Sequence, residues 1–266
     1  MGSEAQNYDV IIVGGAVIGS SIAWHLSGRD DFKGRVLVIE KDPSYEFCST
    51  ALSAASIRQQ FSTPINIEMS GYGIDFLRNL KRDLDPDVDI SLHEKGYLVL
   101  ATDDGRDILR HNHATQTEFG GDIVWMEPDE LAAKYPWMNT SDLAAGCWGR
   151  TGEGWFDAYC LMQSFRKQAR RRGADYIDGE VVEVLRDGDQ ITGVVLKDGR
   201  RFGCGQLVNA AGTGCSKLAK MAGLEIPVEP RKRCIFVFDC RDAADINASC
   251  PMLIDPSGLY VRPEGE

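Results

Sequence analysis

Three glycines and one carboxylate near the amino terminus have the spacing of a dinucleotide-binding turn. Gly14, Gly15 and Gly19 follow an apolar run, and Glu40 lies roughly 20 residues further on, at the end of a second apolar run. A glycine turn lets the backbone approach phosphate groups closely, and a carboxylate at that distance can accept hydrogen bonds from both hydroxyls of a ribose. The pattern therefore predicts binding of FAD or NAD. Because a carboxylate repels a 2′-phosphate, Glu40 disfavours NADP.

The elements that position these residues follow from the hydrophobic pattern. Residues 10–13 form a continuous β-branched run, which is typical of a parallel strand buried on both faces. Residues 17–27 are expected to form a helix whose free N–H groups and positive dipole end face a pyrophosphate. Residues 35–39 are expected to form a second strand. Ala16 replaces the middle glycine of the usual pattern, and we interpret its extra methyl group as a tolerated variant.

The composition excludes several classes of protein. With 266 residues, 43% of them hydrophobic, the chain can bury a large core and is expected to form two lobes. Its formal net charge of −11 argues against a nucleic-acid partner, which would need a basic face. No apolar run is long enough for a transmembrane span, and the polar residues 1–7 carry no secretion signal. We expect a cytoplasmic protein, or a mitochondrial one in a eukaryote.

The eight cysteines show neither a metal site nor a disulfide framework. None forms a C-x-x-C pair, and no cluster of histidines accompanies them. We therefore expect free thiols in a reducing compartment and no bound metal.

Beyond the first turn, the pattern loses its regular alternation of strand and helix in the middle of the chain, which suggests a second lobe. The predicted helices cover residues 64–80, 103–119, 158–172 and 215–222, with a short one that begins at 127–130. The predicted strands cover residues 96–101, 206–213, 230–240 and 259–262, with a meander over 179–202 that turns at two Asp-Gly pairs. The acidic stretch 83–89 is interpreted as a linker.

Four further segments make this order of elements distinctive. They are STALS, RQQFS, YPWMN and EGWFD at residues 49–53, 58–62, 135–139 and 153–157. Together with the glycine turn and the late Asn-Ala-Ala-Gly sequence, they resemble the D-amino-acid oxidase superfamily of FAD-dependent oxidoreductases. That superfamily includes sarcosine oxidase, glycine oxidase, and the sarcosine and dimethylglycine dehydrogenases. The resemblance covers nearly the whole chain.

The resemblance implies an α/β fold. A Rossmann-type FAD-binding domain, a parallel sheet with a β-meander, would comprise residues 8–82 and 153–224. An antiparallel-sheet substrate domain would comprise residues 83–152 and 225–266. Since the chain continues further in the family, we expect this chain to be truncated at its carboxyl end and to self-associate through the resulting sheet edge.

The resemblance also implies which residues hold FAD. The glycine turn would line the pyrophosphate, Glu40 would hold the adenosine ribose, and residues 49–53 would follow the ribityl chain. Val182 would meet the adenine, and residues 210–212 would close over the cofactor. The complete set is Gly14, Gly15, Ala16, Ile18, Gly19, Glu40, Lys41, Ser49, Thr50, Ala51, Leu52, Ser53, Val182, Ala210, Ala211 and Gly212. The alternatives are an ordinary surface loop at 49–53 and tight helix–strand packing at 210–212.

The implied chemistry is oxidation of a C–N bond. Hydride would pass from the carbon beside the nitrogen of a small amine or amino acid to flavin N5, and the electrons would leave to oxygen or to an acceptor protein. A substrate carboxylate needs a cation, which a guanidinium supplies with two hydrogen bonds. Arg58 is the first candidate for that cation. Tyr260 and Arg262 match a strand that crosses the flavin face. The alternatives are a salt-bridged arginine and a merely amphipathic strand.

Two other functions fit part of the pattern. A flavin-binding assembly protein would keep FAD without oxidising an amine, and the sequence leaves this function open. An NAD-dependent dehydrogenase would bind NADH and lack flavin, but the loop at 49–53 and the segment 209–212 argue against it.

Overall fold

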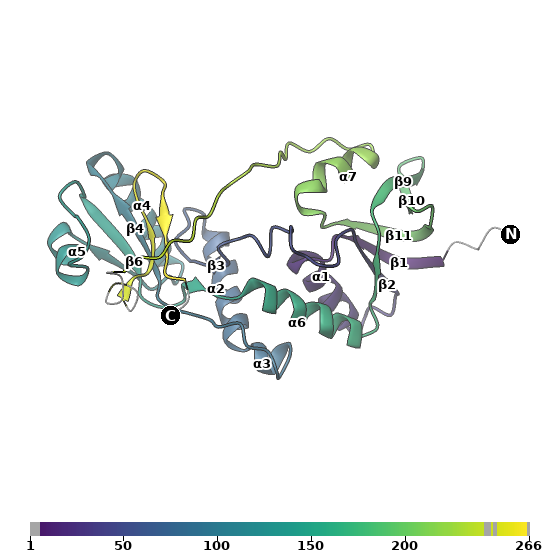
Figure 1. Cartoon of the computed structure of the whole chain (residues 1–266), viewed down its shortest axis with the longest axis horizontal. Coiled ribbons are helices and arrows are strands. Elements are labelled where there is room, and N and C mark those ends of the chain that lie inside the picture. The colour runs from purple at the N-terminus through teal and green to yellow at the C-terminus, as the bar shows by residue number, and fades with distance from the viewer. Residues whose placement is uncertain (1–5, 242–245, 247–248, 265–266) are drawn as a thin grey trace. The chain divides into compact units, whose positions relative to one another are not determined.

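The chain divides into two compact units. The computed structural model describes residues 6–241, 246 and 249–264 (Figure 1). Unit 1 is formed by residues 6–53, 84–90 and 158–234, and unit 2 by residues 54–83, 91–157 and the described residues from 235 onward.

The unit boundaries differ from the sequence-based domains in four ranges. Residues 84–90 and 225–234 lie in unit 1. Residues 54–82 and 153–157 lie in unit 2 and not with the FAD-binding elements. The reason is a pairing that no local pattern reveals. Strand β3 (Ser56–Ile57) runs antiparallel to β7 (Gly154–Trp155), about 100 residues further along the chain, and so draws the segment after the small-residue loop into unit 2.

Unit 1 contains the predicted dinucleotide-binding elements. Its strands are β1 (Gln6–Val13), β2 (Val36–Glu40), β8 (Asp175–Asp178), β9 (Val181–Asp187), β10 (Gln190–Leu196) and β11 (Arg201–Asn209). Its helices are α1 (Val17–Ser27), α6 (Ala158–Arg171), the 3₁₀ turn η1 (Gly212–Gly214) and α7 (Cys215–Met221).

The sheet of unit 1 has six strands in the order β8-β2-β1-β11-β10-β9. The first four are parallel, and β11, β10 and β9 form an antiparallel meander, which confirms the predicted fold of this part. The strand expected at 206–213 is not separate from the meander. It is the second half of β11, which pairs with β1 between Phe202 and Asn209 and ends there, before the predicted end.

The core of unit 1 lies against this sheet. The side chains of Ile11, Leu37 and Val194 are fully buried, and each contributes about 1.5–3 kcal/mol relative to an exposed position. Helices α1 and α6 pack on each other, with the rings of Trp24 and Phe165 5.6 Å apart. Helix α7 lies beside β9 (Figure 1).

Unit 2 contains a second, smaller sheet and most of the remaining helices. Its strands, besides β3 and β7, are β4 (Tyr97–Ala101), β5 (Ile123–Met126), β6 (Ala145–Gly149), β12 (Met252–Ile254) and β13 (Tyr260–Val261). Its helices are α2 (Pro64–Arg78), α3 (Leu80–Asp83), α4 (Asp103–Glu118) and α5 (Pro128–Lys134).

The five-stranded sheet of unit 2 has the order β13-β12-β4-β6-β5. Its pairs are antiparallel except β12 with β4, which is parallel. One core packs Leu98, Leu131 and Tyr135 together, and another joins Tyr97, Trp155 and Met252. The α5 helix begins with a capping box, in which Glu127 and Glu130 satisfy each other's backbone N–H groups.

The prediction of a strand at residues 230–240 is wrong. Residues 224–240 form neither helix nor strand, and Phe236 is 82% exposed. The alternation of apolar residues predicted a strand, but a strand is stable only with a partner. Among the described strands, none pairs with this segment.

Candidate functional site

The glycine turn between β1 and α1 is built for close backbone approach. Gly14 has φ +103°, and a Cβ there would lie 2.2 Å from the carbonyl oxygen of Ala210. A Cβ on Gly19 would lie 1.8 Å from the carbonyl oxygen of Gly14. Ala16, where the usual pattern has glycine, has φ −68°. Alanine adopts that angle readily, so its methyl group causes no backbone strain.

Glu40 binds two backbone N–H groups at the turn. Its Oε2 accepts a hydrogen bond from the backbone N–H of Gly15 at 2.7 Å, and its Oε1 accepts one from the N–H of Asp42 at 2.9 Å. A carboxylate has about four acceptor positions, which leaves capacity for ribose hydroxyls. Lys41 beside it is exposed.

The small-residue loop meets the amino end of α1. The backbone N–H of Val17 donates to Oγ1 of Thr50 at 3.3 Å, and Oγ of Ser53 donates to the carbonyl oxygen of Thr50 at 3.1 Å. Ala16, the N-cap residue of α1, offers no side-chain acceptor, and the first turn of the helix has no acidic residue. The positive end of the helix dipole is therefore not neutralised by an acidic residue of its own first turn.

Several candidate residues expose apolar surface around this turn. Ile18 is 63% exposed, Leu52 62% and Val182 40%. The late strand end joins the same region, because the N–H of Ala210 donates to the carbonyl oxygen of Val13 at 2.9 Å. A tight turn whose glycines leave no room for a larger residue, a helix amino end without an acid in its first turn, a carboxylate beside the turn and exposed apolar side chains fit a dinucleotide with a flat ring system such as FAD.

The candidate residues for the cofactor all lie in unit 1. The structure brings the glycine turn, Glu40, Thr50 and Ala210 together through the contacts above. Val182 lies on β9, three residues after Gly179, whose N–H donates to the carbonyl oxygen of Glu40 at 2.8 Å. Ser49, Ala51, Ala211 and Gly212 lie in the same loop and strand end, and their roles toward the cofactor stay predictions.

The candidate substrate residues all lie in unit 2. Its two candidate arginines differ in whether a carboxylate pairs with them. The guanidinium of Arg58 lies 4.6 Å from the ring centre of Phe61 and 6.0 Å from that of Tyr97. Among the described residues, no carboxylate forms an ion pair with it. Arg262 lies 5.5 Å from the ring centre of Trp155, but it is paired with Glu264 at 2.6 Å. The side chain of Tyr260, on β13, is 43% exposed.

Tyr97 joins this cluster, although the sequence analysis did not select it. Its hydroxyl donates to Oγ of Ser56. Burial raises the pKa of Tyr97, while the bond to Ser56 and the positive charges of Arg58 and Arg262 oppose that rise. The phenol therefore stays neutral near pH 7 and adds no negative charge beside Arg58. The only signal in the sequence was a residue with a polar tip at the start of an apolar strand.

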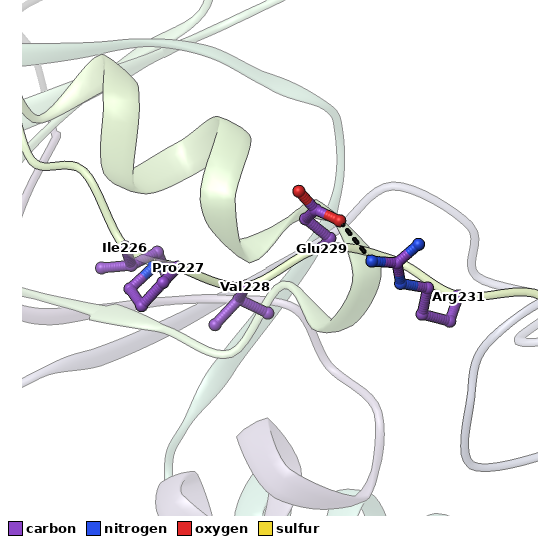
Figure 2. A pocket seen from close by; sticks show the side chains of 5 residues that line it. All are labelled: Ile226, Pro227, Val228, Glu229 and Arg231. Atoms are coloured by element: carbon purple, nitrogen blue, oxygen red, sulfur yellow. Dashed lines mark hydrogen bonds and ion pairs between the residues drawn. The ribbon is translucent and has the colours of Figure 1, made fainter.

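A hollow of about 500 Å³ lies along the extended segment after α7, lined by Ile226, Pro227, Val228, Glu229 and Arg231 (Figure 2). Its two charged groups pair with each other at 2.7 Å. The hollow therefore offers no uncompensated charge to a ligand.

Two further features bear on other functions. The described residues contain no group of three or more His, Cys, Asp or Glu side chains that could hold a metal ion. In the same part of the chain, no helix is both long and apolar enough to cross a membrane.

The fold and the site define a dinucleotide-binding α/β protein with a second, mostly antiparallel sheet. The family model named DAO, FAD dependent oxidoreductase, matches residues 9–266. The chain therefore belongs to this family of FAD-dependent oxidoreductases, and FAD is its cofactor.

Individual proteins agree with this assignment. FAD-dependent oxidoreductase domain-containing protein 1 of Xenopus laevis is 38% identical over 98% of the chain, and the match spans 59% of that relative's length. An L-proline dehydrogenase structure from P. horikoshii has a TM-score of 0.79 and 24% identity, covering 98% of this chain and 68% of that one. A glycine oxidase structure from Geobacillus kaustophilus has a TM-score of 0.72 and 26% identity, covering 85% and 61%.

Proposed function

We propose that the protein oxidises the C–N bond of a small amine or amino acid that carries a carboxylate, such as sarcosine, dimethylglycine or glycine. One observation carries this proposal. In unit 2, the guanidinium of Arg58 rests against two aromatic rings and forms no ion pair among the described residues. A cation held on an aromatic surface without its own counter-ion suits a carboxylate ligand.

The residues of unit 1 would hold the cofactor. The glycine turn and the amino end of α1 would bind the pyrophosphate, and Glu40 would accept bonds from the ribose. Bound FAD would supply the hydride acceptor for the carbon beside the amine nitrogen. The 26% identical glycine oxidase acts, by its name, on an amino acid, which supports this substrate class.

The residues of unit 2 would bind and orient the substrate. Arg58 would take both carboxylate oxygens in a forked pair of hydrogen bonds. The rings of Phe61 and Tyr97 would fix the plane of the guanidinium. Because Tyr97 stays protonated, its hydroxyl can accept or donate a hydrogen bond without repelling the carboxylate.

The test compares substrates with and without a carboxylate. The protein is loaded with FAD and mixed, without oxygen, with an amino acid or with the matching amine that lacks the carboxylate. The pairs are glycine and methylamine, sarcosine and dimethylamine, and proline and pyrrolidine. We expect Arg58→Ala to raise the amino-acid concentration that gives half-maximal flavin reduction by one or two orders of magnitude, ~10- to 100-fold, because a charge-assisted pair is lost. Any reduction by the amines should change little.

Arg150→Ala is the matched control, because Arg150 is an exposed arginine of unit 2 that pairs with Asp122 at 2.7 Å. It should leave the concentration dependence unchanged. If the amino acids reduce the flavin of Arg58→Ala with the same concentration dependence as in the wild-type protein, Arg58 does not bind the substrate. A flavin that no compound reduces would instead favour an assembly protein that only carries FAD. Reoxidation in air would distinguish oxygen from an acceptor protein.

A further inference from the structure

A buried carboxylate in unit 2 has no part in the proposed chemistry so far. Glu153 is fully buried. Its Oε1 accepts hydrogen bonds from the backbone N–H groups of Gln59 at 2.6 Å and Gln60 at 3.0 Å. Its Oε2 accepts from Nε2 of Gln60 at 2.9 Å and from the backbone N–H of Tyr97 at 3.1 Å. Burial raises the pKa of Glu153, and these bonds oppose the rise.

Glycines on both sides make room for this carboxylate. A Cβ on Gly149 would lie 1.9 Å from Oε2 of Glu153, and one on Gly152 would lie 2.3 Å from Nε2 of Gln59. A Cβ on Gly154 would lie 1.9 Å from the carbonyl oxygen of His93. A Cβ atom does not tolerate such distances. Residues 152–154 therefore fit closely against Gln59 on one side and His93 on the other.

The backbone groups that donate to Glu153 all lie beside Arg58, either in sequence or in space. Gln59 and Gln60 directly follow Arg58, and the third backbone donor is Tyr97 itself. The guanidinium of Arg58 lies 6.0 Å from the Tyr97 ring. One carboxylate therefore fixes the backbone on both sides of this contact. Nε2 of Gln60 also donates to the carbonyl oxygen of Tyr97 at 3.1 Å, which joins the two segments directly.

Arg58 depends on such support. Its side chain is exposed and forms no ion pair among the described residues, so its position depends on the backbone and the neighbouring rings. The geometry points to Glu153 as a positioning residue, whose carboxylate sets the orientation in which Arg58 receives the carboxylate of the substrate. This inference rests on the proposed function, because it assigns to Arg58 the binding of that group.

The test measures binding without turnover. Methoxyacetate has the shape of sarcosine and a carboxylate, but an ether oxygen in place of the amine. Its dissociation constant is measured by calorimetry on the full chain loaded with FAD. We expect Glu153→Gln to weaken binding ~10-fold, since an amide can accept only half of the hydrogen bonds that a carboxylate accepts. Glu127→Gln, the control, changes a carboxylate of unit 2 that binds Arg106 and Trp125, and it should bind as wild type does.

A double variant separates positioning from general loss of structure. Arg58→Lys keeps the charge but not the forked geometry. If Glu153 acts through Arg58, adding Glu153→Gln to Arg58→Lys should weaken binding less than twofold, because the two effects are coupled. If Glu153→Gln does not fold, Gln60→Met replaces it, removes one donor, and should weaken binding about threefold.

Three results would overturn the inference: no binding of methoxyacetate by the wild-type protein, wild-type affinity in Glu153→Gln (or in Gln60→Met where that variant replaces it), and an equal loss from the Glu153 change with arginine or lysine at position 58. Failure of the proposed function gives a different result. In that case methoxyacetate binds and depends on Glu153, but no amine or amino acid reduces the flavin.

Discussion

At the scale of single residues, one carboxylate joins the glycine turn to the residues that follow β2. Glu40 binds the N–H groups of Gly15 and Asp42, so it shapes the turn before any ligand arrives. Hydrogen bonds to a charged acceptor contribute about 1.5–3 kcal/mol each. Loss of the side chain should therefore affect the turn as well as the proposed contact with the ribose.

We expect Glu40→Ala to weaken FAD binding at least tenfold (about 1.4 kcal/mol). The dissociation constant is measured by the recovery of flavin fluorescence on dilution. Glu46→Ala changes an exposed acid in the loop that follows β2 and is the control. Equal FAD affinity in the two variants would mean that Glu40 contributes nothing to cofactor binding.

The sequence predicted the residues of the glycine turn but not Tyr97 or Glu153. Gly14, Gly19 and Glu40 act within one local unit, so their spacing along the chain was informative. Glu153 finds its donors 94, 93 and 56 residues away along the chain. No local spacing encodes such a contact, and only the fold brings these groups together.

At the scale of elements, an ion pair between a buried carboxylate and a partly exposed lysine attaches the segment 84–90 to α6 within unit 1. Asp85 is 2% exposed and pairs with Nζ of Lys167 at 2.8 Å. Burial raises the pKa of Asp85, but hydrogen bonds from Lys167 and Gln168 outweigh it, and the pKa lies below its ordinary value of 3.8. Because the folded-state pKa is lowered, the pair stabilises the protein above pH 3.8 and loses its effect as the pH falls through the folded-state value.

Asp85→Asn should therefore lower the free energy of unfolding by about 2 kcal/mol at pH 7, and the difference from wild type should shrink below pH 4. Urea unfolding at several pH values measures it. Asp87→Asn is the control, since Asp87 is 79% exposed and 3.7 Å from Lys167, and it should change stability by less than about 0.5 kcal/mol. A pH-independent loss in Asp85→Asn would contradict the assigned role of its charge.

Elements with a local signal were predicted well, whereas elements that need distant partners were not. Helix α1 begins and ends where the glycine turn and the apolar spacing placed it, at Val17 and Ser27. Strand β6 was missed, since Ala145–Gly149 is rich in small residues and has little strand propensity. The segment 230–240 shows the opposite error, a strand pattern without a strand.

At the scale of the whole molecule, an apolar run stands out from an acidic chain. The exposed fractions of Ile235, Phe236, Val237 and Phe238 are 50%, 82%, 78% and 72%. Exposed apolar runs of this kind favour association, even though the formal net charge of −11 opposes it.

We expect concentration-dependent self-association of this chain, and we expect the double variant Phe236→Ser/Phe238→Ser to reduce it by removing exposed apolar area. Sedimentation velocity at several concentrations measures it. Tyr72→Ser changes a side chain that is 70% exposed on α2 and serves as the control. If the double variant associates as strongly as wild type, the segment is not the contact.

The proposed function requires that an amino acid reduce FAD held by this chain. The most direct measurement is the visible absorbance spectrum of the purified protein, before and after sarcosine, dimethylglycine, proline and glycine are added without oxygen. We expect a flavin band that at least one of these compounds bleaches. A flavin band that none of them bleaches would contradict the proposed oxidation, and a colourless protein that does not take up added FAD would contradict the cofactor site itself.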